Sequence, residues 1–183
     1  MTWIGPEVVL VLGGARSGKR GYALHGAGQY AGRRVFLATR RVADAQMQER
    51  VDRRRKDRGD SWETVEEGEE LIGMIEKEGS SCDVILIDGI PDWITNLMET
   101  RSDREISGQV RALLAALRRP PCPVYLVSGE VGLGVEPEDP STARFRDLLG
   151  TTNRELTRIA REVVWVVAGI PVPIKDPRMR HIL

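Results

Sequence analysis

Cysteine and histidine are scarce in this sequence. The chain has two histidines, His25 and His181, and two cysteines, Cys82 and Cys122. The cysteines lie far apart and show no CxxC or cysteine–histidine spacing. Such spacing is typical of zinc sites, so we expect no zinc site and interpret both cysteines as reduced structural thiols.

Long hydrophobic runs and net charge are also missing. No stretch approaches the roughly 18 apolar residues that span a bilayer, and the N-terminal segment MTWIGPEVVLVLGG lacks the basic region of a signal peptide. The 27 basic and 27 acidic residues cancel, so no overall field favours nucleic acid or an anionic membrane as the main partner. We therefore expect a cytoplasmic protein with no membrane span and no nucleic-acid partner.

What the sequence does contain is an alternation of short apolar runs and longer amphipathic segments. The apolar runs predict strands at 8–12, 34–39, 83–88, 124–128 and 163–169. The amphipathic segments predict helices at about 18–31, 43–57, 67–78, 91–100, 103–118 and 140–161. Residues 171–183 can hold a short edge strand and a tail.

This alternation predicts the fold class. Continuous apolar strands are typical of a sheet covered on both faces, and strands that alternate with helices indicate a mainly parallel sheet. With the loop described next, we expect an α/β protein with a P-loop NTPase-like three-layer fold. The 183 residues show no repeat and no linker composition, so a single nucleotide-binding domain over 1–183 is expected.

A glycine-rich loop follows the first predicted strand directly. Its residues, Gly13, Gly14, Ala15, Arg16, Ser17, Gly18 and Lys19, fit the pattern GxxxxGK. Small residues let successive backbone N–H groups converge on phosphate oxygens, and the following helix presents its positive N-terminal end to the anion. A glycine turn with an exposed lysine is the alternative interpretation. The strand–loop–helix context favours a phosphate site in which Lys19 reaches the β- and γ-phosphates.

The residue after this lysine departs from the pattern. A phosphate-binding loop has Ser or Thr there, whose hydroxyl holds Mg²⁺, whereas this chain has Arg20. A positive charge in the first helical turn is unfavourable unless an anion lies nearby, and a bound triphosphate or Asp88 would neutralise it. Arg20 either supplies the charge of the metal or marks a site that has lost metal-dependent turnover, and both hypotheses stay open.

Asp88 ends the apolar run DVILID. An acidic residue at the tip of a sheet strand can hold Mg²⁺ through water in nucleotide-binding folds. The alternative is an aspartate that caps the next turn. We predict that Asp88 is a catalytic residue and a metal ligand.

Further motifs follow the loop in a fixed order. They are LAT at 37–39, W-x-T-x-E at 62–66, D-x(4)-W-x-TNL at 88–97, SGEVGLGVEP at 128–137, FRDLLGTTNREL at 145–156 and AGIPVPIK at 168–175. Over residues 8–175 the chain resembles the bifunctional adenosylcobinamide kinase/adenosylcobinamide-phosphate guanylyltransferase family of cobalamin biosynthesis. GGARSGK alone is moderately specific, and the combination is highly specific.

The resemblance implies a fold, two reactions and their ligands. It implies a P-loop α/β domain that assembles as a homo-oligomer, usually a trimer. ATP or GTP, with Mg²⁺, would phosphorylate the hydroxyl on the aminopropanol arm of adenosylcobinamide. GTP would then guanylylate an enzyme histidine, and the GMP would pass to adenosylcobinamide phosphate, because a covalent intermediate splits one transfer into two easier ones.

The resemblance also implies roles for residues at matching positions. The loop from Gly13 to Lys19, with Arg20 beside it, would hold the phosphates. The other matched positions at the nucleotide are Ala38, Thr39, Arg40, Glu66 and Asp88. Arg40 stands where the family often has Ser, and Gly129 stands where it commonly has Asn.

The most serious departure concerns the histidine that carries GMP, which the family places in the helix before Trp62. Residues 50–58 are RVDRRRKDR and contain no histidine, and Arg54, or else Arg53, falls at that position. A guanidinium with a pKa above about 12 is no practical nucleophile. If the family mechanism needs that histidine, the covalent guanylyl step is absent here.

The basic run itself allows two interpretations. Its residues include Arg54, Arg55, Lys56, Asp57 and Arg58. They form either a solvated helix face or a guanidinium cluster that grips GTP phosphates. We keep them as candidate site residues, with Arg54 at the catalytic position. Since no aromatic platform accompanies the run, it does not favour nucleic-acid binding.

Three hypotheses follow. The first is an enzyme of this family, in which the kinase half is easier to retain because phosphoryl transfer needs positioning and charge stabilisation rather than a covalent residue. The second is a degenerate nucleotide-binding paralogue that acts as a non-catalytic or regulatory partner, as the departures at positions 20 and 54 suggest. The third is a different P-loop phosphotransferase that acts on another alcohol. We favour the first.

Overall fold

The computed structural model describes residues 7–41, 49, 59 and 61–176. Its strands are β1 Val8–Gly13, β2 Arg34–Ala38, β3 Glu63–Glu66, β4 Val84–Asp88, β5 Val124–Gly129, β6 Glu162–Val167 and β7 Ile170–Lys175. Its helices are α1 Lys19–Ala27, α3 Leu71–Gly79, α4 Ile90–Thr100, α5 Asp103–Leu117 and α6 Pro140–Ile159. These strands form one sheet in the order β3-β2-β4-β5-β1-β6-β7.

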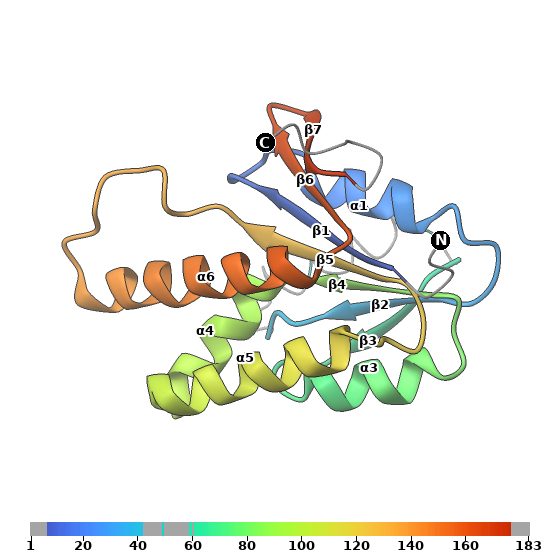
Figure 1. Ribbon diagram of the computed structural model, residues 1–183, viewed down its shortest axis with the longest axis horizontal. Coiled ribbons are helices and arrows are strands. Elements are labelled where there is room, and N and C mark those ends of the chain that lie inside the picture. The colour runs from blue at the N-terminus through green and yellow to red at the C-terminus, as the bar shows by residue number, and fades with distance from the viewer. Residues whose placement is uncertain (1–6, 42–48, 50–58, 60, 177–183) are drawn as a thin grey trace.

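The sheet is parallel except for β7, which runs antiparallel to β6 at one edge. Within the described residues, α1 covers one face of the sheet, and α3, α4, α5 and α6 cover the other (Figure 1). The predicted three-layer α/β fold with a mainly parallel sheet is therefore confirmed, and the glycine-rich loop joins β1 to α1.

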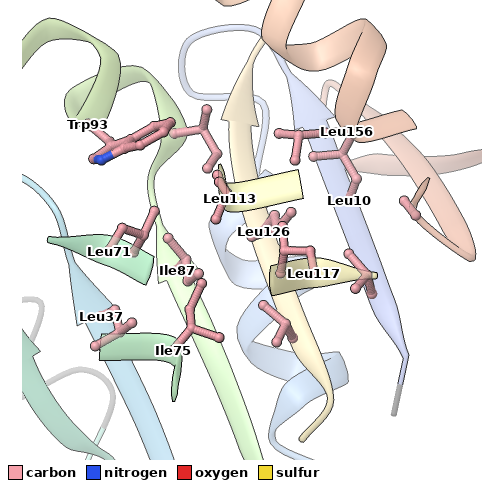
Figure 2. Packing of buried hydrophobic residues seen from close by; sticks show 14 of the residues in the cluster. Leu10, Leu37, Leu71, Ile75, Ile87, Trp93, Leu113, Leu117, Leu126 and Leu156 are labelled. Atoms are coloured by element: carbon pink, nitrogen blue, oxygen red, sulfur yellow. The ribbon is translucent and has the colours of Figure 1, made fainter. Parts of the chain in front are cut away.

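The central strands are apolar throughout because both of their faces are buried. In β1, Leu10 belongs to the large cluster beneath α3–α6, whereas its neighbour Val9 belongs to the smaller cluster beneath α1. Figure 2 shows the large cluster, in which Leu10 and Leu126 of the sheet lie beneath side chains of the helices, among them Leu156. This two-sided burial fixes β1, and with it the start of the loop.

All five predicted strands are present, with ends shifted by at most two residues. The edge strand expected after residue 170 is β7, and β3 was not predicted as a strand. Helix α1 ends at Ala27, before the predicted residue 31, and α3 begins at Leu71, after the predicted residue 67. The helix predicted at 43–57 lies outside the described residues, apart from Glu49.

In the described part of the chain, every helix is too short or too polar to cross a membrane.

Helix α1 lies close to the sheet because the residues facing it are small. Ala23 and Ala27 are fully buried. A Cβ atom added at Gly26 would lie 2.9 Å from the ring of Tyr125 on β5, closer than side chains normally approach. A Cβ atom added at Gly21, one and a half turns earlier, would meet nothing within 4 Å.

The two glycines of α1 therefore make a matched pair. We expect Gly26→Ala to lower the free energy of unfolding by about 1–3 kcal/mol, because the added methyl group overpacks the contact with Tyr125. Gly21→Ala should raise it by about 0.5–1 kcal/mol, because alanine is the better helix former. Urea unfolding measures both. Equal effects of the two substitutions would contradict the close packing of α1.

Candidate functional site

The carboxyl ends of the parallel strands meet at one edge of the sheet. Gly13 pairs in register with Gly129 at the ends of β1 and β5. Ala38, which ends β2, pairs with Asp88 on one side and with Glu66 on the other. Residues from five different parts of the sequence thus share this edge, which is where α/β proteins bind ligands.

The glycine-rich loop is held in place by its backbone conformation and by backbone contacts with β6 and the turn after it. Gly18 has a φ of 93° and Arg16 a φ of 56°, both in the left-handed region, and α1 begins directly afterwards. Gly13 has no room for a side chain, because an added Cβ would lie 2.6 Å from the carbonyl oxygen of Val166. The backbone N–H of Gly169 donates to the carbonyl oxygen of Ser17 at 2.9 Å. The loop is therefore anchored to β6 and to the turn that follows it.

Lys19 points back across this loop. Its Nζ donates to the carbonyl oxygen of Gly14 at 3.0 Å. Burial lowers the pKa of Lys19; the carboxylate of Asp88 partly offsets this effect, and the charge of Arg20 adds to it. A phosphate anion beside Lys19 would favour its charged form and would compete with Gly14 for the ammonium group.

Arg20 and Asp88 form an ion pair, through Nη2 of the arginine and Oδ2 of the aspartate. The side chain of Asp88 is only 9% exposed and that of Arg20 is 32% exposed. A carboxylate so deeply buried requires a partner. Of the two anions that could neutralise Arg20, the structure shows Asp88.

A cavity of about 590 Å³ opens in front of this ion pair. Its charged lining residues are Arg16, Lys19, Arg20, Arg40, Asp88 and Asp92, which give a net charge of +2. Arg40 and Asp92, which both line the cavity, form an ion pair at 3.1 Å. The volume and the charge suit a small anionic ligand.

Thr39 is not among the residues that line this cavity. Its side chain is fully buried. Its Oγ1 donates to the carbonyl oxygen of Gly89 at 2.7 Å and accepts from the N–H of Gly89 at 2.8 Å. Asn96 donates from Nδ2 to the carbonyl oxygens of Thr39 and Gly68, each at 2.8 Å. Thr39 thus joins the ends of β2 and β4, and Asn96 of α4 joins the end of β2 to the segment that follows β3.

The structure brings together part of the predicted site. Residues 15–20, Arg40 and Asp88 line the cavity, and Gly13 and Gly14 lead into it. Ala38 and Thr39 lie at the strand end behind it, and Glu66 is exposed at the end of β3, outside the cavity lining. Arg54, Arg55, Lys56, Asp57 and Arg58 lie outside the described residues.

Other lining residues were not predicted from the sequence. Asp92 and Pro91 come from the first turn of α4, and Phe145 comes from α6. Asp92 could have been found from the sequence, because it is a second carboxylate only four residues after Asp88 and shortly after a strand end.

A second cavity of about 510 Å³ lies on the other side of the same loop. It shares Ala15, Arg16, Ser17 and Val131 with the first. Trp165 packs against the large cluster and also lines this cavity, and Glu130 is a further lining residue. The loop thus forms a common wall between two openings.

A family model and two curated relatives that match this chain have closely related descriptions. The family model described as cobinamide kinase / cobinamide phosphate guanyltransferase matches residues 9–174. The bifunctional adenosylcobalamin biosynthesis protein CobU of Escherichia coli is 34% identical, over 92% of this chain and 99% of that protein. The corresponding CobP protein of Pseudomonas aeruginosa is 33% identical, over 91% of this chain and 96% of its own length.

Two solved structures are also similar. The P4 protein of bacteriophage phi6 in complex with ADP aligns with a TM-score of 0.46 and 14% identity, over 91% of this chain and 54% of that one. The RadB recombinase aligns with a TM-score of 0.48 and 16% identity, over 88% of this chain and 74% of that one.

The contacts of Thr39 give a test of the strand ends. Thr39→Val should lower the free energy of unfolding by about 1–3 kcal/mol, because it leaves the N–H and carbonyl groups of Gly89 without their hydroxyl partner. Thr39→Ser keeps the hydroxyl and should cost less. Urea unfolding measures both. A serine variant as unstable as the valine variant would show that losing the methyl group costs as much as losing the hydroxyl, and would contradict the special role given to the hydroxyl.

Proposed function

Because the chain belongs to the cobinamide kinase / cobinamide phosphate guanyltransferase family, we propose that it phosphorylates adenosylcobinamide with a nucleoside triphosphate, ATP or GTP. The acceptor hydroxyl oxygen would bond to the γ-phosphorus, the bond from this phosphorus to the β–γ bridging oxygen would break, and the nucleoside diphosphate would leave. The hydroxyl proton would pass to solvent. The observation that carries this proposal is the basic cavity formed by the GxxxxGK loop at the carboxyl edge of the sheet.

The loop and its neighbours support the binding of the triphosphate. The backbone N–H groups of the loop and the N-terminus of α1 would receive the phosphates. Lys19 would exchange the carbonyl of Gly14 for a β- or γ-phosphate oxygen, and Arg16 and Arg40 would add charge at the two sides. We place the hydroxyl-bearing arm of the acceptor in the second cavity, because this cavity adjoins the first across the loop and has apolar lining residues, including Leu133 and Trp165.

The residues at the site do not fit a Mg²⁺ ion. Magnesium requires oxygen ligands in near-octahedral geometry. Residue 20 lacks a hydroxyl group, and the cavity's carboxylates, Asp88 and Asp92, are each paired with an arginine. Asp88 as a metal ligand stays a prediction that requires Arg20 to move away.

We propose that the covalent guanylyl step is absent. The sequence lacks the histidine expected before Trp62. His25 does not supply a substitute near the loop, because it is exposed in the last turn of α1, whereas the loop adjoins the first turn. The kinase step needs no such residue, since it depends on positioning and charge.

We also propose that the chain forms a homo-oligomer, a trimer, in the cytoplasm. Edge strand β7 exposes Ile170, Val172 and Ile174, by 66%, 41% and 53% of their surfaces. Apolar side chains at an exposed sheet edge support contact with another copy. Light scattering should give a mass three times the 20.4 kDa of the chain. A single-chain mass would contradict the proposed assembly.

Two labels distinguish the reactions. Purified chain is incubated with cobinamide and either γ-labelled ATP or α-labelled GTP, and we expect only the γ-label to reach cobinamide. Lys19→Ala should lower the rate about 100-fold or more, because it removes a charge that stabilises the transferring phosphoryl group. Lys77→Ala, an exposed lysine on α3, is the matched control and should leave the rate unchanged.

The other outcomes are equally informative. An α-label on the protein or on cobinamide would contradict the loss of the guanylyl step. If that label is missing from the wild type but appears in Arg54→His, the missing histidine is the cause. Nucleotide binding without transfer of either label would instead favour a degenerate nucleotide-binding paralogue. Transfer of the γ-label to a different alcohol would favour another phosphotransferase.

A further inference from the structure

An arginine is an unusual residue directly after the lysine of a phosphate-binding loop, where Ser or Thr is usual. Arg20 lies in the first turn of α1, lines the cavity and contacts Asp88. Asp88 ends β4, which is separated from β1 by β5. A fixed organic cation therefore bridges the helix that follows the loop and the strand end that carries the acidic residue.

This bridge satisfies Asp88 and leaves the arginine able to bind a ligand. A guanidinium carries five N–H donors in a planar fork, more than the contact through Nη2 engages. The side chain of Arg20 is 32% exposed, whereas that of Asp88 is 9% exposed. The carboxylate is thus enclosed, whereas Arg20 keeps exposed surface and lines the cavity where phosphates would lie.

The same bridge disfavours a divalent ion. A metal at Asp88 would have to displace Arg20, because both bind the same buried carboxylate, and the two positive charges would repel each other. Asp92 offers no ready alternative, since Arg40 contacts its Oδ1 through both Nε, at 3.2 Å, and Nη2, at 3.1 Å.

We propose that Arg20 takes the place of the divalent cation, so that the chain binds a nucleoside triphosphate as the metal-free anion. This inference rests on the proposed nucleotide site. The cavity has a net charge of +2 with Arg20 and would have +1 without it. Arg20 thus contributes a positive charge that other phosphate loops obtain from a metal bound to the serine or threonine hydroxyl.

Binding of a fluorescent mant-ATP probe tests this inference. The full chain is titrated at constant ionic strength, once with excess Mg²⁺ and once with EDTA. We expect the two Kd values of the wild type to agree within about threefold. In EDTA, Arg20→Ser should bind about tenfold more weakly, the loss expected for one charge-assisted hydrogen bond, and Mg²⁺ should restore most of its affinity.

Further variants separate charge from structure. Arg20→Lys keeps the charge and should retain most of the affinity in EDTA. Arg158→Ser also removes an arginine paired with a carboxylate, but at the far end of α6, and should behave like the wild type. Melting temperatures show that each variant is folded. If Arg20→Ser does not fold, the wild-type comparison and Arg20→Lys still decide the matter.

Two results would overturn the inference. Binding by the wild type that is more than about threefold tighter with Mg²⁺ than in EDTA would show that a metal contributes to binding, and the proposed nucleotide site would still stand. Failure of the wild type to bind the probe in either condition would overturn both the inference and the proposed nucleotide site.

Discussion

Parallel pairing of the strands decides where the functional groups of this molecule lie. Because six strands run in the same direction, their carboxyl ends share one edge, and the chain must leave that edge through a loop or turn each time. The glycine-rich loop, Thr39 and Asp88 occupy three of those exits. Without this common direction, residues so distant in sequence would not surround one cavity.

The five strands predicted from apolar runs are those that the sheet buries most fully, whereas β7 was expected only as an edge strand. β1 and β4 are buried at every position, so their runs of valine, leucine and isoleucine stand out from their surroundings. β3 has four residues, with Glu63 and Glu66 exposed and only the middle pair half-buried. Its strand conformation comes from pairing with β2, a tertiary contact that its local composition does not encode.

The same distinction applies to the site. The loop could be found because its residues are contiguous and each has a backbone requirement. The partner of Arg20 was narrowed to a triphosphate or Asp88, but only the fold brings a helix start and a strand end together across β5. Thr39 matched a family motif near the nucleotide, whereas its contacts with Gly89 show a hydroxyl that fastens two strand ends. The sequence motif indicates that Thr39 has a role near the site, but it does not show whether that role is to contact the nucleotide or to join the strand ends.

The anchoring of the loop at both ends has a consequence for the rate of ligand capture. Gly13 packs closely against the backbone of β6, and Ser17 accepts a hydrogen bond from Gly169. The conformational entropy of ordering the loop is therefore already lost when the chain folds. A ligand would meet a preorganised surface, in which the main adjustment is the release of the Lys19 ammonium group from Gly14. Side-chain rotation of this kind is fast compared with diffusion at ordinary concentrations. The speed of association would then depend on encounter and charge rather than on a rearrangement of the backbone.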